Sequence, residues 1–234
     1  MECSWLSAVG SIPSSVPSPE RLEAYREEGA SDLETLVNYF WNMELSEALY
    51  PGLQAFEIAL RNSIHTALTD RFHDDMWFDR PGLLLEWQVG AVKQAREELD
   101  KHHKLHESGR IVAELHFGFW HSMFNRPYED VLWYPDGAAL LDVVFPHLPR
   151  PLRIRKEIWK RIDRIRRLRN RVFHYEPIWK KRDLDDLGTH VHEMLAVISP
   201  ELEAVVALTA RYSIVLSEGR QVISERLVHL LEMD

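Results

Sequence analysis

The sequence contains a single cysteine, Cys3, which excludes a disulfide framework and any metal site built from cysteine thiolates. It has no run of about 18 uncharged apolar residues, so we expect no transmembrane helix and no membrane partner. Residues 1–20 carry neither a basic segment nor a long apolar one, which argues against a secretory signal. Together these absences predict a cytoplasmic protein.

Strand patterns, internal repeats and low-complexity tracts are also lacking. A hydrophobic content of 45% and a charged content of 28% are typical of globular proteins, and 234 residues suffice for a proper core. Residues 1–17, rich in Ser and Pro, predict a flexible N-terminal arm. For 18–234 we predict a single all-α domain, an elongated helical bundle.

Helix starts and breaks follow from caps and prolines. Ser18 and Pro19 start a short helix that ends by Gly29, and Asp32 caps a longer one. The pair Pro51–Gly52 predicts a break or kink before a helix over 53–72. A loop is expected over 128–137, and the apolar periodicity predicts helices over these further ranges: 83–104, 108–123, 138–145, 183–198, 200–219 and around 227–231.

The charge is concentrated in one stretch. Residues 150–182 contain 14 Lys or Arg and three acids, a balance of +11 in a chain of net charge −9, so the remainder sums to −20. Such a local positive field within an acidic protein is typical of a surface that binds a polyanion.

The same stretch has the periodicity of an amphipathic helix. Pro151 suits a first helical position, and Pro177 predicts that the helix ends near His174 or Tyr175. The apolar face is formed by isoleucines and a valine at three- and four-residue steps: Ile154, Ile158, Ile162, Ile165 and Val172.

A polar group interrupts that apolar face. Arg169 lies seven residues after Ile162, so its guanidinium faces inward and needs an anion or several acceptors. Asn170 and His174 are four apart and stack one turn from each other beside it. Arg169, Asn170 and His174 can thus converge on a groove at the helix end. A structural Arg–acid pair with a helix-terminal histidine explains the same pattern.

A second polar group lies earlier in the chain. Glu57 falls on the apolar stripe of the helix over 53–72, with Arg61 one turn away and Arg169 as a long-range partner. Arg61, Asn62 and His65 repeat the later triad superficially. We interpret them as residues that anchor helices, and a supporting role for Glu57, Arg61 and Asn62 in the same groove is the alternative.

Other histidines predict no metal site. Glu98, His102 and His106 step by four, but a solvated helix end explains them better than a metal. His116 and His121 are interpreted as core or edge histidines. Two further histidines, His190 and His192, are interpreted as surface residues. We therefore expect neither a metal nor a cofactor.

Three blocks resemble the Abi-like branch of the HEPN superfamily, which is associated with abortive phage infection. Arg169 to His174 (RNRVFH) is similar to the R-N-x-x-x-H form of its motif. Residues 56–62 (FEIALRN) and 112–120 (VAELHFGFW) resemble two further blocks, in the same order along the chain. The resemblance spans about 33–202. It implies a HEPN-type helical bundle with flanking helices that dimerises and often acts as a metal-independent ribonuclease.

The resemblance implies a toxin-like, antiviral endoribonuclease with Arg169, Asn170 and His174 as its catalytic residues. Attack by a 2′-hydroxyl on RNA needs a base, an acid and a clamp for the phosphorane, and a homodimer would bring two histidines together. A non-catalytic RNA- or nucleotide-binding module that regulates a partner, or is itself bound by a non-coding RNA or antitoxin, is the alternative. The residues expected to contact RNA are Arg153, Lys156, Lys160, Arg164, Arg167 and Arg171.

Overall fold

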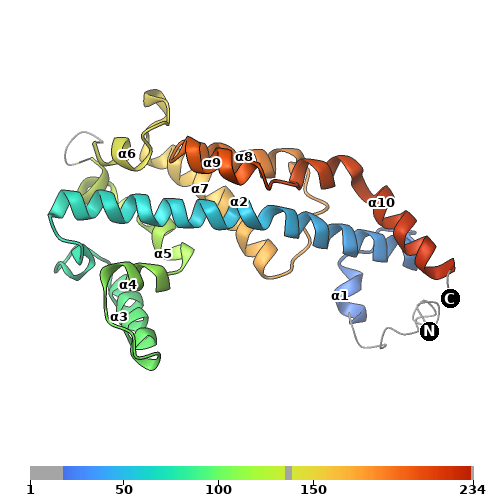
Figure 1. Ribbon diagram of the computed structural model, residues 1–234, viewed down its shortest axis with the longest axis horizontal. Helices are drawn as coiled ribbons and strands as arrows, with labels where there is room; N and C mark the ends of the chain where they lie inside the picture. Colours follow the sequence, from blue (N-terminus) through green and yellow to red (C-terminus); the bar gives the residue numbers. More distant parts are fainter. Residues whose placement is uncertain (1–17, 135–138, 233–234) are drawn as a thin grey trace. The chain divides into compact units, whose positions relative to one another are not determined.

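The computed structural model describes residues 18–134 and 139–232, which form α-helices joined by short turns and contain no strand (Figure 1). The all-α prediction is confirmed. The arm predicted over 1–17 and the turn predicted at 135–137 lie outside the described residues. The helices are α1 Pro19–Glu23, α2 Asp32–Phe72, α3 Glu86–Lys101, α4 Ser108–Glu114, α5 Phe117–Ser122, α6 Ala139–Val144, α7 Arg155–Phe173, α8 Leu184–Ala196, α9 Pro200–Ala207 and α10 Tyr212–Glu232. None of them carries an apolar stretch of the length that a bilayer requires.

The described residues form two compact units. The first unit contains 18–51, 168–189 and 209–232, and the second unit contains the rest. The helices α2, α7 and α8 contribute residues to both. The single domain expected over 18–234 stays a prediction.

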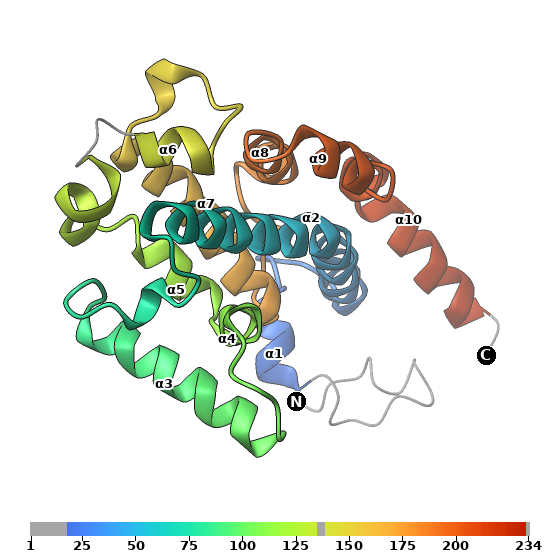
Figure 2. The ribbon, with the colours of Figure 1, turned by 60° about the vertical axis from the view of Figure 1, so that its left-hand side comes forward.

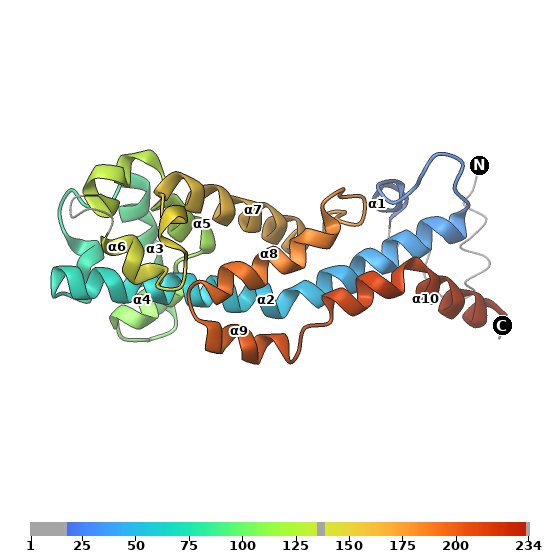
Figure 3. The same cartoon turned by 90° about the horizontal axis from the view of Figure 1, so that it is seen from above.

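In the first unit, the N-terminal part of α2 lies beside α10 (Figures 1 and 3). The indole of Trp41 donates to the carbonyl of Val215 at 3.4 Å, and Arg226 pairs with Glu44 at 2.8 Å. Gly188 allows α8 to approach the same layer, because a Cβ there would lie 2.4 Å from the ring of Tyr212. Close helix packing thus positions α10 in this unit.

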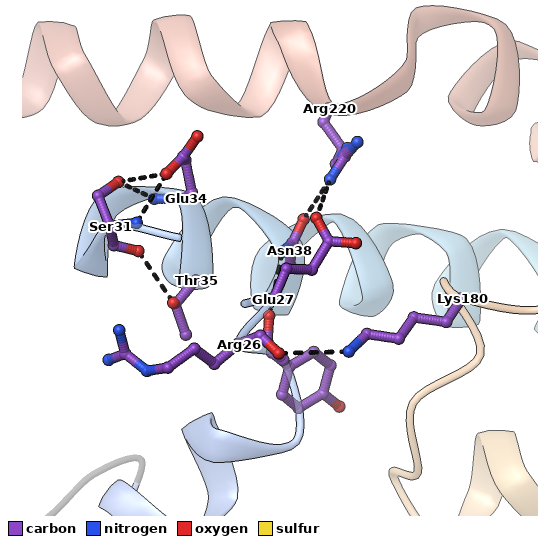
Figure 4. A network of polar contacts seen from close by, with 9 residues as sticks. Arg26, Glu27, Ser31, Glu34, Thr35, Asn38, Lys180 and Arg220 are labelled. Atoms are coloured by element: carbon purple, nitrogen blue, oxygen red, sulfur yellow. Dashed lines mark hydrogen bonds and ion pairs between the residues drawn. The ribbon is translucent and has the colours of Figure 1, made fainter. Parts of the chain in front are cut away.

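A polar network connects four segments of the first unit (Figure 4). Arg220 of α10 donates to Asn38 of α2 at 3.0 Å and pairs with Glu27 at 3.4 Å. The segment after α7 joins through Lys180, which donates to the carbonyl of Arg26 at 3.3 Å. Buried Asn38 is thereby satisfied, as an interior amide must be.

The second unit has an aromatic core (α3 to α5 are shown in Figure 2). Trp77, Phe119 and Trp120 are buried, and the rings of Trp77 and Trp120 meet edge to face at 6.4 Å. Phe124 and Trp133 stack at 4.4 Å. Burial of rings of this size is the main stabilising contribution available to a unit of helices.

The helix α2 differs from the predictions at its proline and at its cap. The break predicted at Pro51–Gly52 is wrong, since α2 continues from Asp32 to Phe72, whereas the kink given as its alternative stays a prediction. Buried Leu49 and Leu53 flank the proline, so packing outweighs the hydrogen bond that it cannot donate. The cap of α2 is Ser31 rather than Asp32, because Ser31 and Glu34 form a reciprocal capping box.

The helix predicted over 108–123 is two helices, α4 and α5, because Leu115 and His116 adopt extended backbone angles. The break lets the indole of Trp120 bond to the carbonyl of Leu115 at 3.3 Å. The loop predicted over 128–137 contains a short π-helical turn over 129–133, and 150–152 forms a separate turn before α7. The helix predicted over 200–219 ends at Ala207.

Candidate functional site

The end of α7 carries the predicted triad within the first unit. The N–H of Tyr175 bonds to the carbonyl of Val172 at 3.2 Å, and that of Glu176 to the carbonyl of Arg171 at 2.8 Å. These two bonds form a Schellman motif, which satisfies the last carbonyls of a helix. His174 is therefore the C-cap residue, and the prediction that the helix ends near it is confirmed.

The residue after the cap adopts an unusual conformation. Tyr175 has φ of 58°, a region where glycine is favoured and other residues cost about 1–2 kcal/mol. Its carbonyl accepts hydrogen bonds from the guanidinium of Arg21 and, at 3.4 Å, from the hydroxyl of Tyr25. The segment after Tyr175 is held by Asn42, whose Oδ1 accepts a hydrogen bond from the N–H of Ile178 at 2.7 Å. Contacts with α1 and α2 thus stabilise a conformation that the tyrosine alone would not prefer.

Arg169 is half-buried at this helix end, between the fully buried Leu168 and Val172. Its guanidinium carbon lies 4.2 Å from the centroid of the Phe173 ring. The Phe173 ring in turn meets Tyr50 edge to face at 5.0 Å. Stacking on an aromatic face is a favourable interaction for the planar guanidinium of an arginine.

Asn170 and His174 lie one turn apart on α7, and the N–H of His174 bonds to the carbonyl of Asn170 at 2.9 Å. Asn170 is half-buried, and the side chain of His174 is exposed. An exposed imidazole can exchange protons with a bound molecule, and the amide can donate and accept hydrogen bonds. With the fork of Arg169 one turn earlier, the helix end has the groups needed to bind and protonate a phosphate ester.

The residues predicted to support the triad lie in the second unit. Arg61 donates to the carbonyl of Ala113 at 3.3 Å, and Asn62 is exposed. His65 accepts from the indole of Trp77 at 3.0 Å, an arrangement typical of a helix anchor. The convergence of Glu57, Arg61 and Asn62 on the triad stays a prediction.

Most of the six cations predicted to contact RNA already form ion pairs with carboxylates of the chain. Lys156 is exposed and forms no ion pair with a described carboxylate, and Arg164 is half-buried. The other four have carboxylate partners within the chain: Arg153 with Asp142, Lys160 with Glu157, Arg167 with Asp163 and Arg171 with Glu176. The balance of +11 already counts Glu157, Asp163 and Glu176, so of these four pairs only that of Arg153 with Asp142 lowers the positive charge further.

Sequence reasoning missed a buried charge cluster on α7 in the second unit. Asp163 is 5% exposed and accepts from Arg166 at 2.7 Å and from Arg167 at 2.7 Å. Burial alone would raise the pKa of this carboxyl, but the two guanidinium groups hold the pKa below its ordinary value. His121 lies 3.5 Å from the same carboxylate, and burial lowers the pKa of its imidazole to about 4. The signal was present as acid and base three and four residues apart.

The remaining histidines correct one prediction. His190 is buried rather than on the surface, its Nε2 lies 3.1 Å from the carbonyl of Arg161, and burial lowers its pKa. His192 is partly exposed and lies 3.0 Å from Glu203. His121 is buried, as predicted for a core histidine, and His116 is exposed.

The predicted histidine–acid stripe is split. His102 lies 3.3 Å from Glu98, whereas His106 turns to Asp100 at 2.7 Å. Within 18–134 and 139–232, no group of three or more His, Cys, Asp or Glu side chains is arranged to hold a metal ion.

Comparison with protein-family models, with curated proteins and with solved structures found no match to the chain. The site at the end of α7 is therefore interpreted from its own chemistry.

Proposed function

We propose that the chain is an endoribonuclease that cleaves RNA at the end of α7 with Arg169, Asn170 and His174. The observation that carries the proposal is the exposed His174 at a fixed helix cap, with Asn170 and the stacked guanidinium of Arg169 within the preceding five residues. The resemblance to the Abi-like HEPN branch supports the same residues and a role in defence against phage.

The proposed reaction uses these side chains together with a second histidine. His174 accepts the proton of a ribose 2′-hydroxyl as the oxygen attacks the neighbouring phosphorus, and a second histidine protonates the departing 5′-oxygen. Arg169 stabilises the phosphorane with two parallel hydrogen bonds, which a lysine could not reproduce. Asn170 orients the imidazole or a phosphate oxygen. The products are a 2′,3′-cyclic phosphate and a 5′-hydroxyl.

One chain supplies one histidine to this helix end, whereas the reaction transfers two protons. A two-fold homodimer with the two helix ends facing each other would supply both. We therefore propose that the active species is a dimer. A monomer at micromolar concentration that still cleaves RNA would contradict this part of the proposal.

A second candidate function is a non-catalytic RNA- or nucleotide-binding module. The observation that favours it is the same shortage of histidines, since a clamp of Arg169 and Asn170 binds a phosphate without any proton transfer. Such a module would act on a partner, and its own RNA would remain intact.

End-group analysis separates the two functions. Purified protein is incubated with total cellular RNA in the presence of EDTA, and the termini of the fragments are identified. The proposal predicts fragments with 5′-hydroxyl and 2′,3′-cyclic phosphate ends. Intact RNA that co-purifies with the protein would support the binding module, and 3′-hydroxyl ends would contradict the proposed chemistry.

A further inference from the structure

The first unit contains a cavity of about 890 Å³ that the proposed reaction does not use. It is lined by α1, by the N-terminal part of α2, by Tyr175 after α7 and by the C-terminal part of α10, and it is open to solvent. Ligand sites for small molecules have volumes of about 300–1,000 Å³, so this cavity is large enough for one.

One wall of the cavity comes from α2. Tyr39, Phe40, Met43 and Tyr50 line it, and the wall is therefore apolar and aromatic. Met43 remains 50% exposed and Tyr50 36% exposed, although both are large. The Oγ of Ser46, another lining residue, is buried without a hydrogen-bond partner. Part of the apolar surface of this wall is therefore left uncovered by the described residues.

The opposite wall is the part of α10 that follows Gly219. Gly219 has φ of 63° and ψ of −158°, so the helix direction changes there, and Arg220 fixes the next turn to Asn38 (Figure 4). Ile223 and Leu227 then face the cavity together with Leu230, which is 52% exposed. The spacing of four and three residues places all three on one side of the helix.

Four charged side chains line the cavity, and their charges sum to zero: Arg21, Glu44, Glu47 and Arg226. Glu44 is paired with Arg226 at 2.8 Å, and Glu47 is paired with Arg211 at 3.3 Å. The guanidinium of Arg21 donates to the neutral carbonyl of Tyr175, and no described carboxylate forms an ion pair with it. An apolar cavity with one such guanidinium is complementary to a ligand with an apolar body and one anionic group.

We propose that this cavity binds a single-chain amphiphilic anion, a fatty-acid-like carboxylate, with its chain between α2 and α10 and its head group on Arg21. A cationic ligand would be repelled by Arg21, since both acids of the cavity already have partners. A fully apolar ligand would leave the Arg21 guanidinium inside the site without an anion. A fatty-acid-like carboxylate places its apolar chain against both walls and its anionic group against Arg21.

Calorimetric titration of the full chain with decanoate tests the proposal. We expect one decanoate per chain, and Arg21→Gln should weaken binding about tenfold or more, because a charge-assisted hydrogen bond is lost. Arg21→Lys should retain most of the affinity. The control Arg110→Gln, which removes an exposed arginine of the second unit, should leave binding unchanged. The neutral analogue 1-decanol should bind equally to the wild type and to Arg21→Gln.

Chain length and cavity filling provide a second test. Each buried methylene is worth about fourfold in affinity, so octanoate should bind about fifteenfold more weakly than decanoate. Met43→Trp fills the cavity and should abolish decanoate binding while the protein stays folded. Binding that ignores chain length, Arg21 and Met43 would overturn the proposal. A second copy of the chain that covers the cavity and excludes decanoate would also overturn it.

The cavity reaches the proposed catalytic residue through Tyr175, so a consequence of this binding rests on the proposed function. Decanoate should shift the imidazole NMR signals of His174 and leave those of exposed His147 unchanged. Absence of decanoate binding overturns the cavity proposal whatever the chain does to RNA. Decanoate binding without RNA cleavage overturns only the proposed function.

Discussion

The part of α7 in the second unit and the part in the first unit use cations differently. Over 155–167 the arginines serve the chain itself: Arg155 is 8% exposed and bonds to Glu129, and Arg166 and Arg167 neutralise buried Asp163. In the last turn, Arg169 stacks on an aromatic ring and His174 is exposed. A high count of basic residues therefore does not by itself indicate a binding surface, because several of these residues pair with carboxylates of the chain.

The largest expected effect on stability comes from the structural part of α7. Arg155→Met leaves the half-buried Glu129 and the carbonyl of Phe124 without their donor, so we expect a loss of about 1–3 kcal/mol in the free energy of unfolding. Urea denaturation measures it. Lys156→Gln, at the adjacent exposed position, should change stability by less than about 0.5 kcal/mol. Equal effects of the two variants would contradict the comparison.

The next effect is on the pH dependence of stability. His121 has a pKa of about 4 in the folded chain against about 6.5 when unfolded, so below pH 6.5 only the unfolded state takes up this proton. Its contribution to stability should therefore fall by about 1.4 kcal/mol per pH unit from about pH 6.5 to about pH 4.

His121→Gln should reduce the slope of the unfolding free energy against pH between about pH 6.5 and about pH 4. The contribution of Asp163, whose pKa is lowered, is lost only at more acidic pH. The other groups that face His121 are the guanidinium groups of Arg166 and Arg167 and the ring of Trp159. An unchanged slope in the variant would exclude His121 as the titrating group.

A smaller effect is expected at the site itself. Tyr175 has φ of 58°, so Tyr175→Gly should be about 1 kcal/mol more stable than Tyr175→Ala. Thermal unfolding of the two variants measures the difference and removes the contribution of the tyrosine ring from the comparison. A more stable alanine variant would mean that the backbone at 175 is not left-handed.

The smallest effect concerns RNA binding by the two kinds of cation. Lys156→Gln should reduce the slope of log affinity against log salt concentration by about 0.7, the value for one phosphate of a single strand. Arg167→Gln should reduce it by less, because Asp163 already holds that guanidinium. A larger change for Arg167 would show that the pair opens when RNA binds.

The sequence predicted the helical class and the end of α7, because apolar periodicity and Pro177 act locally. It did not predict that α2 continues through Pro51, since the burial of Leu49 and Leu53 is a tertiary effect. The break at Leu115–His116 was missed because the segment is apolar nearly all round, so no period identifies its ends.

For the site, the sequence identified the residue types but not their burial or their contacts. The exposure of His174 and the stack of Arg169 on Phe173 depend on how α7 packs. The pairs at Asp163 were readable from their three- and four-residue spacing, whereas the burial that strengthens them was not. His190 was placed on the surface because its neighbours in space come from α7, far away in the sequence.

The central claim is that His174 transfers a proton during RNA cleavage, and single-turnover cleavage by His174→Ala tests it most directly. The account predicts a loss of about 10²- to 10⁴-fold or more, with melting temperature and RNA affinity close to those of the wild type. His147→Ala, which removes another exposed histidine, should cleave normally. A folded His174→Ala protein that binds RNA and cleaves it at the wild-type rate would contradict the claim.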